Sequence, residues 1–134
     1  MAETFLLEVA TPERLLVREQ VREAQIPAKN GYLGVLPEHS PLLSELGTGE
    51  LTYRVEGFST SLAVDGGGVE VLPSHVRVLA IHAERASEID AERAQEALKR
   101  AQERLARPAS GVDIARALNA MRRAQARLQT AQHK

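Results

Sequence analysis

The chain has 134 residues, of which 43% are hydrophobic and 26% charged, and it contains no cysteine. This composition is typical of a globular protein and excludes a disordered chain, a disulfide scaffold and a thiolate metal site. No apolar run approaches the roughly 18 residues of a membrane span, and the acidic start of the chain is unlike a secretory signal. The sequence therefore favours a soluble, intracellular protein.

The net charge of −1 conceals two halves of opposite sign. Residues 1–82 carry 6 basic and 11 acidic side chains, whereas residues 83–134 carry 11 basic and 7 acidic ones. Eight of the nine glycines and all four aromatic residues lie in the first part. This asymmetry predicts two differently built modules, an N-terminal domain over residues 1–84 and a C-terminal domain over residues 85–134.

The first module consists of short runs rich in branched residues, separated by glycine and proline. Polar and apolar residues alternate in many of these runs, which is the pattern of a half-buried strand. Breaks are expected at Pro27 and at Asp65-Gly-Gly-Gly68, among others. The pattern predicts an antiparallel β-sandwich or barrel with strands at Phe5–Ala10, Val21–Ile26, Tyr32–Leu36, Leu51–Glu56, Ser61–Val64, Val69–Leu72 and Val76–Ile81.

The second module has a helical period. One apolar stripe begins at Ile89 and a second begins at Ile114, with the helix-breaking Pro108 between them. Two helices joined by so short a loop are expected to form an antiparallel hairpin. The spacings of Ser87 with Asp90 and of Ser110 with Asp113 predict capping boxes for the two helices.

Most residues of both stripes are alanine, which favours helix formation but buries little apolar area. The two helices are therefore expected to form readily and to hold each other weakly. Two interpretations remain open from the residues alone. The hairpin is either a switch that opens without unfolding its helices or a helical appendage docked on the sheet.

Residue patterns for catalysis are missing from the sequence. The histidines His39, His75, His82 and His133 lack zinc-motif spacing, and the glycine-rich segments lack the Gly-Lys-Ser/Thr of a phosphate loop. We therefore expect no catalytic residue, no metal site and no enzymatic activity of this chain alone. Nucleic acid is a poor fit as a partner, because the basic half of the chain has no aromatic residue.

Arginines mark one side of each predicted helix. A charged helix face is usually only solvated, but facing arginine stripes also suit a polyphosphate or an acidic protein surface. The residues are Arg93, Arg100, Arg104 and Arg107 on the first helix and Arg116, Arg123 and Arg127 on the second.

Four segments together resemble the epsilon subunit of F-type ATP synthases. The first is Gly31-Tyr-Leu-Gly-Val-Leu-Pro-Glu-His-Ser-Pro41, continuing to Gly47-Thr-Gly49. The others are Val64-Asp-Gly-Gly-Gly-Val-Glu-Val71, Val76-Arg-Val-Leu-Ala80 and Glu84-Arg-Ala-Ser-Glu-Ile-Asp-Ala-Glu-Arg-Ala94. Their order and spacing extend the resemblance over essentially the whole chain.

The resemblance implies a sandwich of about ten strands followed by a helix–loop–helix. It also implies a non-catalytic rotor subunit of the central stalk, bound through its sandwich to the gamma subunit and the c-ring. Such a subunit couples proton- or sodium-driven rotation to ATP synthesis in the alpha/beta head, and its C-terminal helices inhibit ATP hydrolysis. The implied location is peripheral, on the cytoplasmic side of the cell membrane, with membrane association only through the complex.

The resemblance further implies three sets of functional residues, and no required cofactor beyond ATP as a regulatory ligand. The implied ATP-binding residues are Glu84, Ile89, Asp90, Arg93, Ala94, Arg100, Arg123 and Arg127. The residues implied to contact the beta subunit during inhibition are Arg116, Arg122, Arg123 and Arg127. A structural or interface loop contains Gly31, Gly34, Pro37, His39 and Pro41. For Asp90 and the arginines, helix capping and solvation are the alternative roles.

Two other functions compete with that of a rotor subunit. A nucleotide-sensing module is compatible with the same chain. A free-standing β-sandwich binding module with a helical tail needs none of the four matched segments, and it predicts a stable monomer that functions alone.

Overall fold

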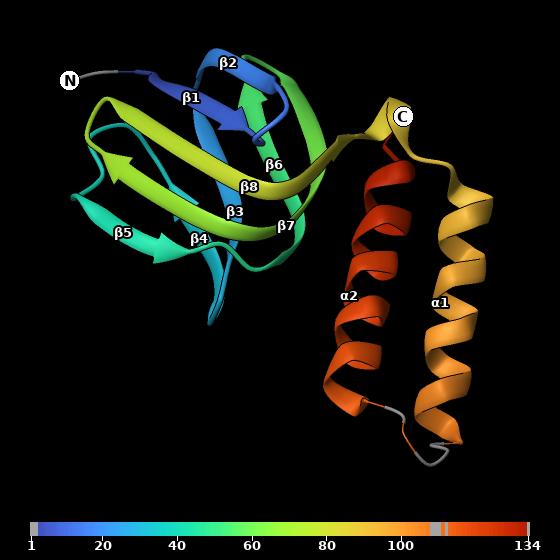
Figure 1. Ribbon diagram of the computed structural model, residues 1–134. Helices are drawn as coiled ribbons and strands as arrows, with labels where there is room; N and C mark the ends of the chain where they lie inside the picture. The colour runs from blue at the N-terminus through green and yellow to red at the C-terminus, as the bar shows by residue number, and fades with distance from the viewer. Residues whose placement is uncertain (1–2, 108–110, 112, 134) are drawn as a thin grey trace.

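The computed structural model describes residues 3–107, 111 and 113–133. In this part of the chain eight strands precede a short 3-10 helix and two α-helices (Figure 1). The strands are β1 (Phe5–Ala10), β2 (Leu15–Val21), β3 (Glu23–Ala28), β4 (Gly31–Val35), β5 (Leu42–Glu45), β6 (Thr48–Val55), β7 (Phe58–Leu72) and β8 (His75–Arg85). The helices are η1 (Ala86–Glu88), α1 (Ala91–Ala106) and α2 (Ile114–Ala131). This architecture confirms the predicted sandwich followed by a helical hairpin.

Two long strands connect the two layers of the sandwich. Strand β7 pairs with β6 along residues 58–65 and with β5 along residues 68–71. Strand β8 pairs with β7 throughout and also with β1, which is the one parallel pair among the described strands. Each layer thus contains five strand segments, β2-β1-β8-β7-β5 in one and β8-β7-β6-β3-β4 in the other. The expected ten or so strands correspond to ten segments built from eight strands.

The predicted break at residues 65–68 is wrong, because this segment lies inside β7. Gly66 and Gly67 have φ angles of +69° and +121°, a region that favours glycine. A Cβ atom on Gly67 would lie 1.9 Å from the carbonyl oxygen of Leu79. The glycines therefore let the strand bend between layers while it stays paired with β8.

Other strand boundaries also differ from the sequence pattern. The alternating pattern did not predict β2 as a strand. Leu16 and Val17 are consecutive buried residues, next to a register shift in the β1–β2 pair, so polar and apolar residues do not alternate there. The pattern did not predict the short strand β5 either. Pro27 lies inside β3 rather than after it, beyond Glu23–Gln25, the part that pairs with β6. A proline there removes no donor from the β3–β6 ladder.

The core lies between the two layers and consists mainly of aliphatic side chains, with the aromatic rings of Phe5 and Tyr53 among them. Its largest fully buried members are Phe5, Leu7, Ile26, Leu51 and Leu62. Burial of such side chains is the main stabilising contribution to the sandwich. The N-terminal strand β1 supplies two of them and is therefore an integral part of this domain.

Aspartates begin both long helices. The Oδ1 atom of Asp90 accepts a hydrogen bond from the Arg93 amide at 3.1 Å, and Asp113 does the same for Arg116 at the same distance. The predicted capping role of Ser87 is wrong, since Ser87 lies in η1; Ser110 lies outside the described residues. A carboxylate at the N-cap also interacts favourably with the helix dipole, which a serine hydroxyl cannot match.

Helix α2 lies against β6 and β7 of the sandwich, and α1 packs mainly on α2 (Figure 1). The buried residues of α2 are small: Ala117, Ala124, Ala126 and Thr130. Those of α1 are Ala94 and Ala101. Because these side chains bury little apolar area, apolar packing holds the hairpin on the sandwich only weakly. No helix in the described ranges is both long and apolar enough to cross a membrane.

A charged cluster fixes the junction between sandwich and hairpin. Arg14, in the turn after β1, makes two contacts with the Glu88 carboxylate, at 2.6 and 2.9 Å. The Arg85 amide also donates to Glu88, at 2.7 Å, and Arg14 donates to the carbonyl oxygen of Ala83 at 3.3 Å. The Arg14 hydrogen bonds, followed by that of the Arg85 amide, lower the pKa of Glu88 from 4.5 to about 2.

The substitution Thr130→Val is expected to stabilise the protein. The Thr130 side chain is fully buried, and its hydroxyl has no hydrogen-bond partner among the described residues. Replacing it with a methyl group should raise the free energy of unfolding by about 1 kcal/mol, measured by urea denaturation. The matched control is Thr48→Val, which loses a hydrogen bond to Asp65 and should be destabilised. A destabilised Thr130→Val variant would contradict this account of the α2 interface.

The substitution Glu88→Gln should have a pH-dependent effect on stability. Because the pKa of Glu88 is lowered in the folded chain, its carboxylate contributes stability above pH 4.5, and this contribution is lost as the pH falls through about 2. At pH 7 the variant should lose about 1 kcal/mol, since the ion pair is partly exposed. Urea denaturation of both chains between pH 7 and pH 3 measures the difference, with Glu103→Gln as the control. If the difference in the free energy of unfolding between the two chains stays constant over this range, the pKa of Glu88 is not lowered in the folded chain.

Candidate functional site

A cavity of about 780 Å³ lies between the hairpin and the sandwich. Both helices line one side of it, and β7, β8 and the turn between β1 and β2 line the other. Its volume falls within the range of small-molecule sites in proteins. The two walls differ in charge, and this difference determines what the cavity can bind.

The helical wall is basic. Five arginines line the cavity there, interspersed with alanines that leave room between them. Spacings of four and seven residues place these arginines on one face of each helix. The arginines are Arg93, Arg100 and Arg104 from α1 and Arg123 and Arg127 from α2. Guanidinium groups converging from two helices suit the oxygens of a phosphate chain.

The sandwich wall is acidic. Glu84 of β8, Asp65 of β7 and Glu13 of the β1–β2 turn all line the cavity. Glu84 contacts Arg127 twice, at 2.8 Å to Nε and 3.3 Å to Nη2. Asp65 lies 3.9 Å from Nε of Arg123. Two of the five arginines therefore already face carboxylates of the chain itself.

A third contact lies beyond the cavity lining. Nδ1 of His133, just past α2, lies 2.8 Å from Oε2 of Glu50 on β6. The Glu50 side chain is only 7% exposed. We call the three pairs Arg123–Asp65, Arg127–Glu84 and His133–Glu50 the docking contacts. The two arginine pairs are partly exposed, and such pairs typically contribute less than about 1 kcal/mol each.

Five of the eight residues implied to bind ATP line this cavity: Glu84, Arg93, Arg100, Arg123 and Arg127. The other three do not line it. Ile89 is buried immediately before α1, Asp90 caps that helix, and Ala94 is fully buried in the hairpin. Asp90 and Ala94 therefore set the start and the packing of α1, which carries Arg93 and Arg100 into the cavity wall.

The four arginines implied to contact the beta subunit point in different directions. Arg116 and Arg122 are exposed and lie outside the cavity lining, whereas Arg123 and Arg127 face the sandwich acids. In this docked form of the hairpin, only part of the implied set is available to another protein.

The implied interface residues lie outside the cavity lining. Gly31 and Gly34 belong to β4, and Pro37, His39 and Pro41 lie between β4 and β5. Nδ1 of His39 lies 2.8 Å from the carbonyl oxygen of Ser40, a contact that fixes the loop locally.

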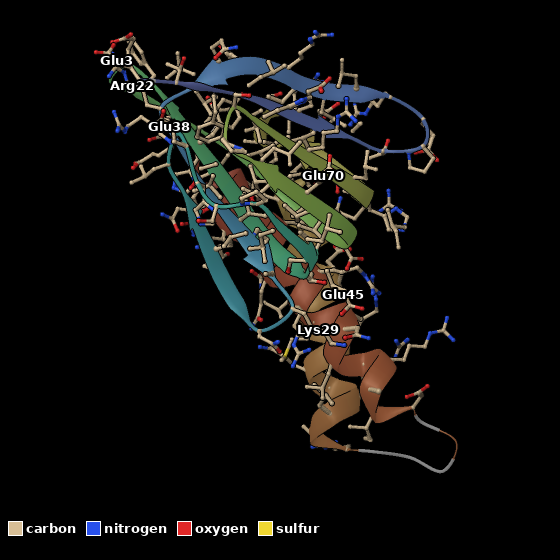
Figure 2. The ribbon with its side chains drawn as sticks, turned by 90° about the vertical axis from the view of Figure 1, so that its left-hand side faces the viewer. Glu3, Arg22, Lys29, Glu38, Glu45 and Glu70 are labelled. Atoms are coloured by element: carbon tan, nitrogen blue, oxygen red, sulfur yellow. The ribbon has the colours of Figure 1, made fainter. Side chains whose placement is uncertain are left out.

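Figure 2 shows Glu38 of this loop at the end of the sandwich opposite the hairpin, whereas the ion pair of Lys29 and Glu45 lies toward the hairpin. Exposed apolar side chains accompany this segment, namely Leu36 in the loop and Leu42 and Leu43 in β5. This end of the sandwich is therefore suited to protein contacts.

Residues that the sequence did not single out are mostly acids. Asp65, Glu13 and Arg14 line the cavity, and Glu50 holds His133. Arg14, Asp65 and Glu50 each meet a partner from a distant part of the chain, so local spacing carries no signal for these three pairs. The position of Asp65 before three glycines is visible in the sequence, but by itself it indicates only turn chemistry.

Two family models match the chain. The model of the ATP synthase delta/epsilon chain β-sandwich domain matches residues 4–86. The model of the ATP synthase delta/epsilon chain long α-helix domain matches residues 87–132. Together they cover most of the chain.

Curated relatives carry the same description. The chain is 61% identical to the ATP synthase epsilon chain of Solibacter usitatus, over 81% of both chains. It is 52% identical to that of Koribacter versatilis, over 78% of this chain and 74% of the relative. It is 50% identical to that of Carboxydothermus hydrogenoformans, over 80% of both chains.

Solved structures share the fold. A chain in the Euglena gracilis mitochondrial ATP synthase, a structure of OSCP, F1 and the c-ring, is 25% identical with a TM-score of 0.84. The match covers 99% of this chain and 84% of that one. A chain in the central stalk and c-ring of Tetrahymena thermophila mitochondrial ATP synthase is 13% identical with a TM-score of 0.58, covering 96% and 94%, and supports the fold alone. The chain belongs to the ATP synthase delta/epsilon family, as an epsilon subunit of the bacterial type.

Proposed function

We propose that this epsilon subunit is a non-catalytic part of the central stalk, attached through its sandwich to the gamma subunit and the c-ring. Family membership favours this role over a free-standing binding module. The Euglena gracilis assembly comprises F1 and the c-ring. It contains a chain that is similar to 99% of the length of this one. The exposed apolar side chains around residues 36–43 supply a surface for such contacts at the end opposite the hairpin. The subunit then couples proton- or sodium-driven rotation to ATP synthesis in the alpha/beta head, peripherally on the cytoplasmic side of the cell membrane.

The hairpin is the regulatory part of this proposal. Its weak apolar packing and partly exposed ion pairs make the free-energy cost of undocking small, while both helices can persist by their alanine content. Once undocked, α2 presents Arg116, Arg122, Arg123 and Arg127 to an acidic surface of the beta subunit, which attracts them over several turns. Hydrolysis of ATP by the alpha/beta head is then restrained.

ATP is the proposed ligand of the cavity, and the convergence of five implied residues there carries this part of the proposal. Arginines of both helices bind the phosphate oxygens, and the alanine-lined space between them accommodates the base. Because the cavity has walls from both domains, a ligand in it binds only the docked form. Bound ATP therefore selects the docked hairpin and relieves inhibition in proportion to its differential affinity.

Calorimetric titration of the intact chain tests the ATP site. We expect binding of ATP by the wild-type chain and at least about tenfold weaker binding by Arg100→Gln, which removes a phosphate-facing guanidinium. Arg116→Gln is the matched control, because that arginine is on α2 but outside the cavity lining. The absence of ATP-dependent heat at millimolar nucleotide would remove the sensor from the proposal.

Truncation tests the inhibitory role. A chain ending at Arg85, the last residue of β8, keeps all eight described strands and loses the hairpin. Reconstituted with the remaining subunits, it should assemble normally and hydrolyse ATP several-fold faster than the intact complex at low ATP. The double variant Arg116→Ala/Arg122→Ala should show part of this gain, because only exposed cations are removed. Equal hydrolysis rates in the truncated and intact complexes would rule out inhibition by the hairpin.

A further inference from the structure

Asp65 occupies a fixed position in the sandwich wall of the cavity. It lies in β7 opposite Thr48 of β6, whose hydroxyl donates a hydrogen bond to Oδ1 at 2.5 Å. The positive φ angles of Gly66 and Gly67 bend the strand immediately after it. Its side chain is 25% exposed, so the carboxylate faces the cavity without being free to move away from it.

Asp65 and Glu84 engage their arginines differently. Both carboxylate oxygens of Glu84 lie close to Arg127: Oε2 accepts a hydrogen bond from Nη2 at 3.3 Å, and Oε1 lies 2.8 Å from Nε without a hydrogen bond to it. Asp65 meets Arg123 through a single contact at 3.9 Å, beyond hydrogen-bond distance. The attraction to Asp65 is thus mainly Coulombic, and Arg123 keeps its donors for an incoming anion.

An anion in the cavity experiences Asp65 as a like charge. Phosphate oxygens that bind Arg123 must approach the carboxylate that already attracts this guanidinium. At a separation of about 6 Å and an effective dielectric constant between about 40 and 80, as in an open cavity that water enters, the repulsion corresponds to about threefold to tenfold in affinity. Such a penalty raises the ligand concentration needed to occupy the site without preventing binding.

We infer that Asp65 is an affinity-determining residue of the cavity, which competes with the phosphate chain of a nucleotide for Arg123. This inference rests on the proposed ATP site. Asp65 sets the nucleotide concentration at which the hairpin becomes locked in the docked form. The same carboxylate holds α2 in place when the cavity is empty, so it substitutes for the missing phosphate.

Calorimetric titration of the intact Asp65→Asn chain with ATP tests the inference, with and without Mg²⁺. Asparagine keeps the acceptor for Thr48 and removes only the negative charge. We expect ATP binding about threefold to tenfold tighter than in the wild-type chain under both conditions. Glu13→Gln is the matched control, because it also removes an acid from the cavity wall but has no ion pair with an arginine among the described contacts. It should change the affinity by less than twofold.

Each other result has a defined meaning. Unchanged or weaker binding by Asp65→Asn overturns the inference while leaving the ATP site intact. Weaker binding only in the presence of Mg²⁺ also overturns it, because Asp65 would then be a metal ligand. An equal gain in Glu13→Gln overturns it as well, since the gain would reflect net charge alone. If neither the wild-type nor the Asp65→Asn chain binds ATP, the proposed site fails and this inference fails with it.

Discussion

The docking contacts between the C-terminal part of the chain and the sandwich are the interactions that hold the hairpin in place. Alanines dominate the buried face of α2, so apolar packing alone leaves the hairpin weakly attached. Two arginines and one histidine of the C-terminal half therefore complete the interface by contacting acids of β6, β7 and β8. In the two arginine pairs, a base of the hairpin meets an acid of the sandwich.

Ligand binding in the cavity is coupled to docking of the hairpin, because residues of both domains line the cavity. Two of the three docking contacts, Arg123–Asp65 and Arg127–Glu84, line the cavity, whereas His133–Glu50 lies outside its lining. A ligand that engages the arginines stabilises the docked form by mass action. A ligand in the cavity does not compete for the contact of His133 with the buried Glu50, because neither residue lines the cavity. The Arg14–Glu88 pair fixes the start of the hairpin, and Arg14 itself also lines the cavity.

The sequence was informative where structure is local and uninformative where distant segments meet. The spacing of alanines and arginines correctly predicted two antiparallel helices, because the same spacing recurs along the whole of each helix. The glycines at 66 and 67 suggested a chain break, yet they bend a continuous strand, since pairing with β8 outweighs the local preference for a turn. Asp90 rather than Ser87 caps α1. The partner of Glu50 lies 83 residues away, which no motif spacing reveals.

Native-state hydrogen exchange of the intact chain, at low and high salt, tests most directly whether the hairpin docks through weak polar contacts. The account predicts that amides of α2 exchange through an opening of lower free energy than amides of β7, and that salt accelerates exchange in α2 while leaving β7 unchanged. Exchange of α2 and β7 as one cooperative unit, insensitive to salt, would contradict it. In that case the hairpin would be an integral part of the fold rather than a detachable one.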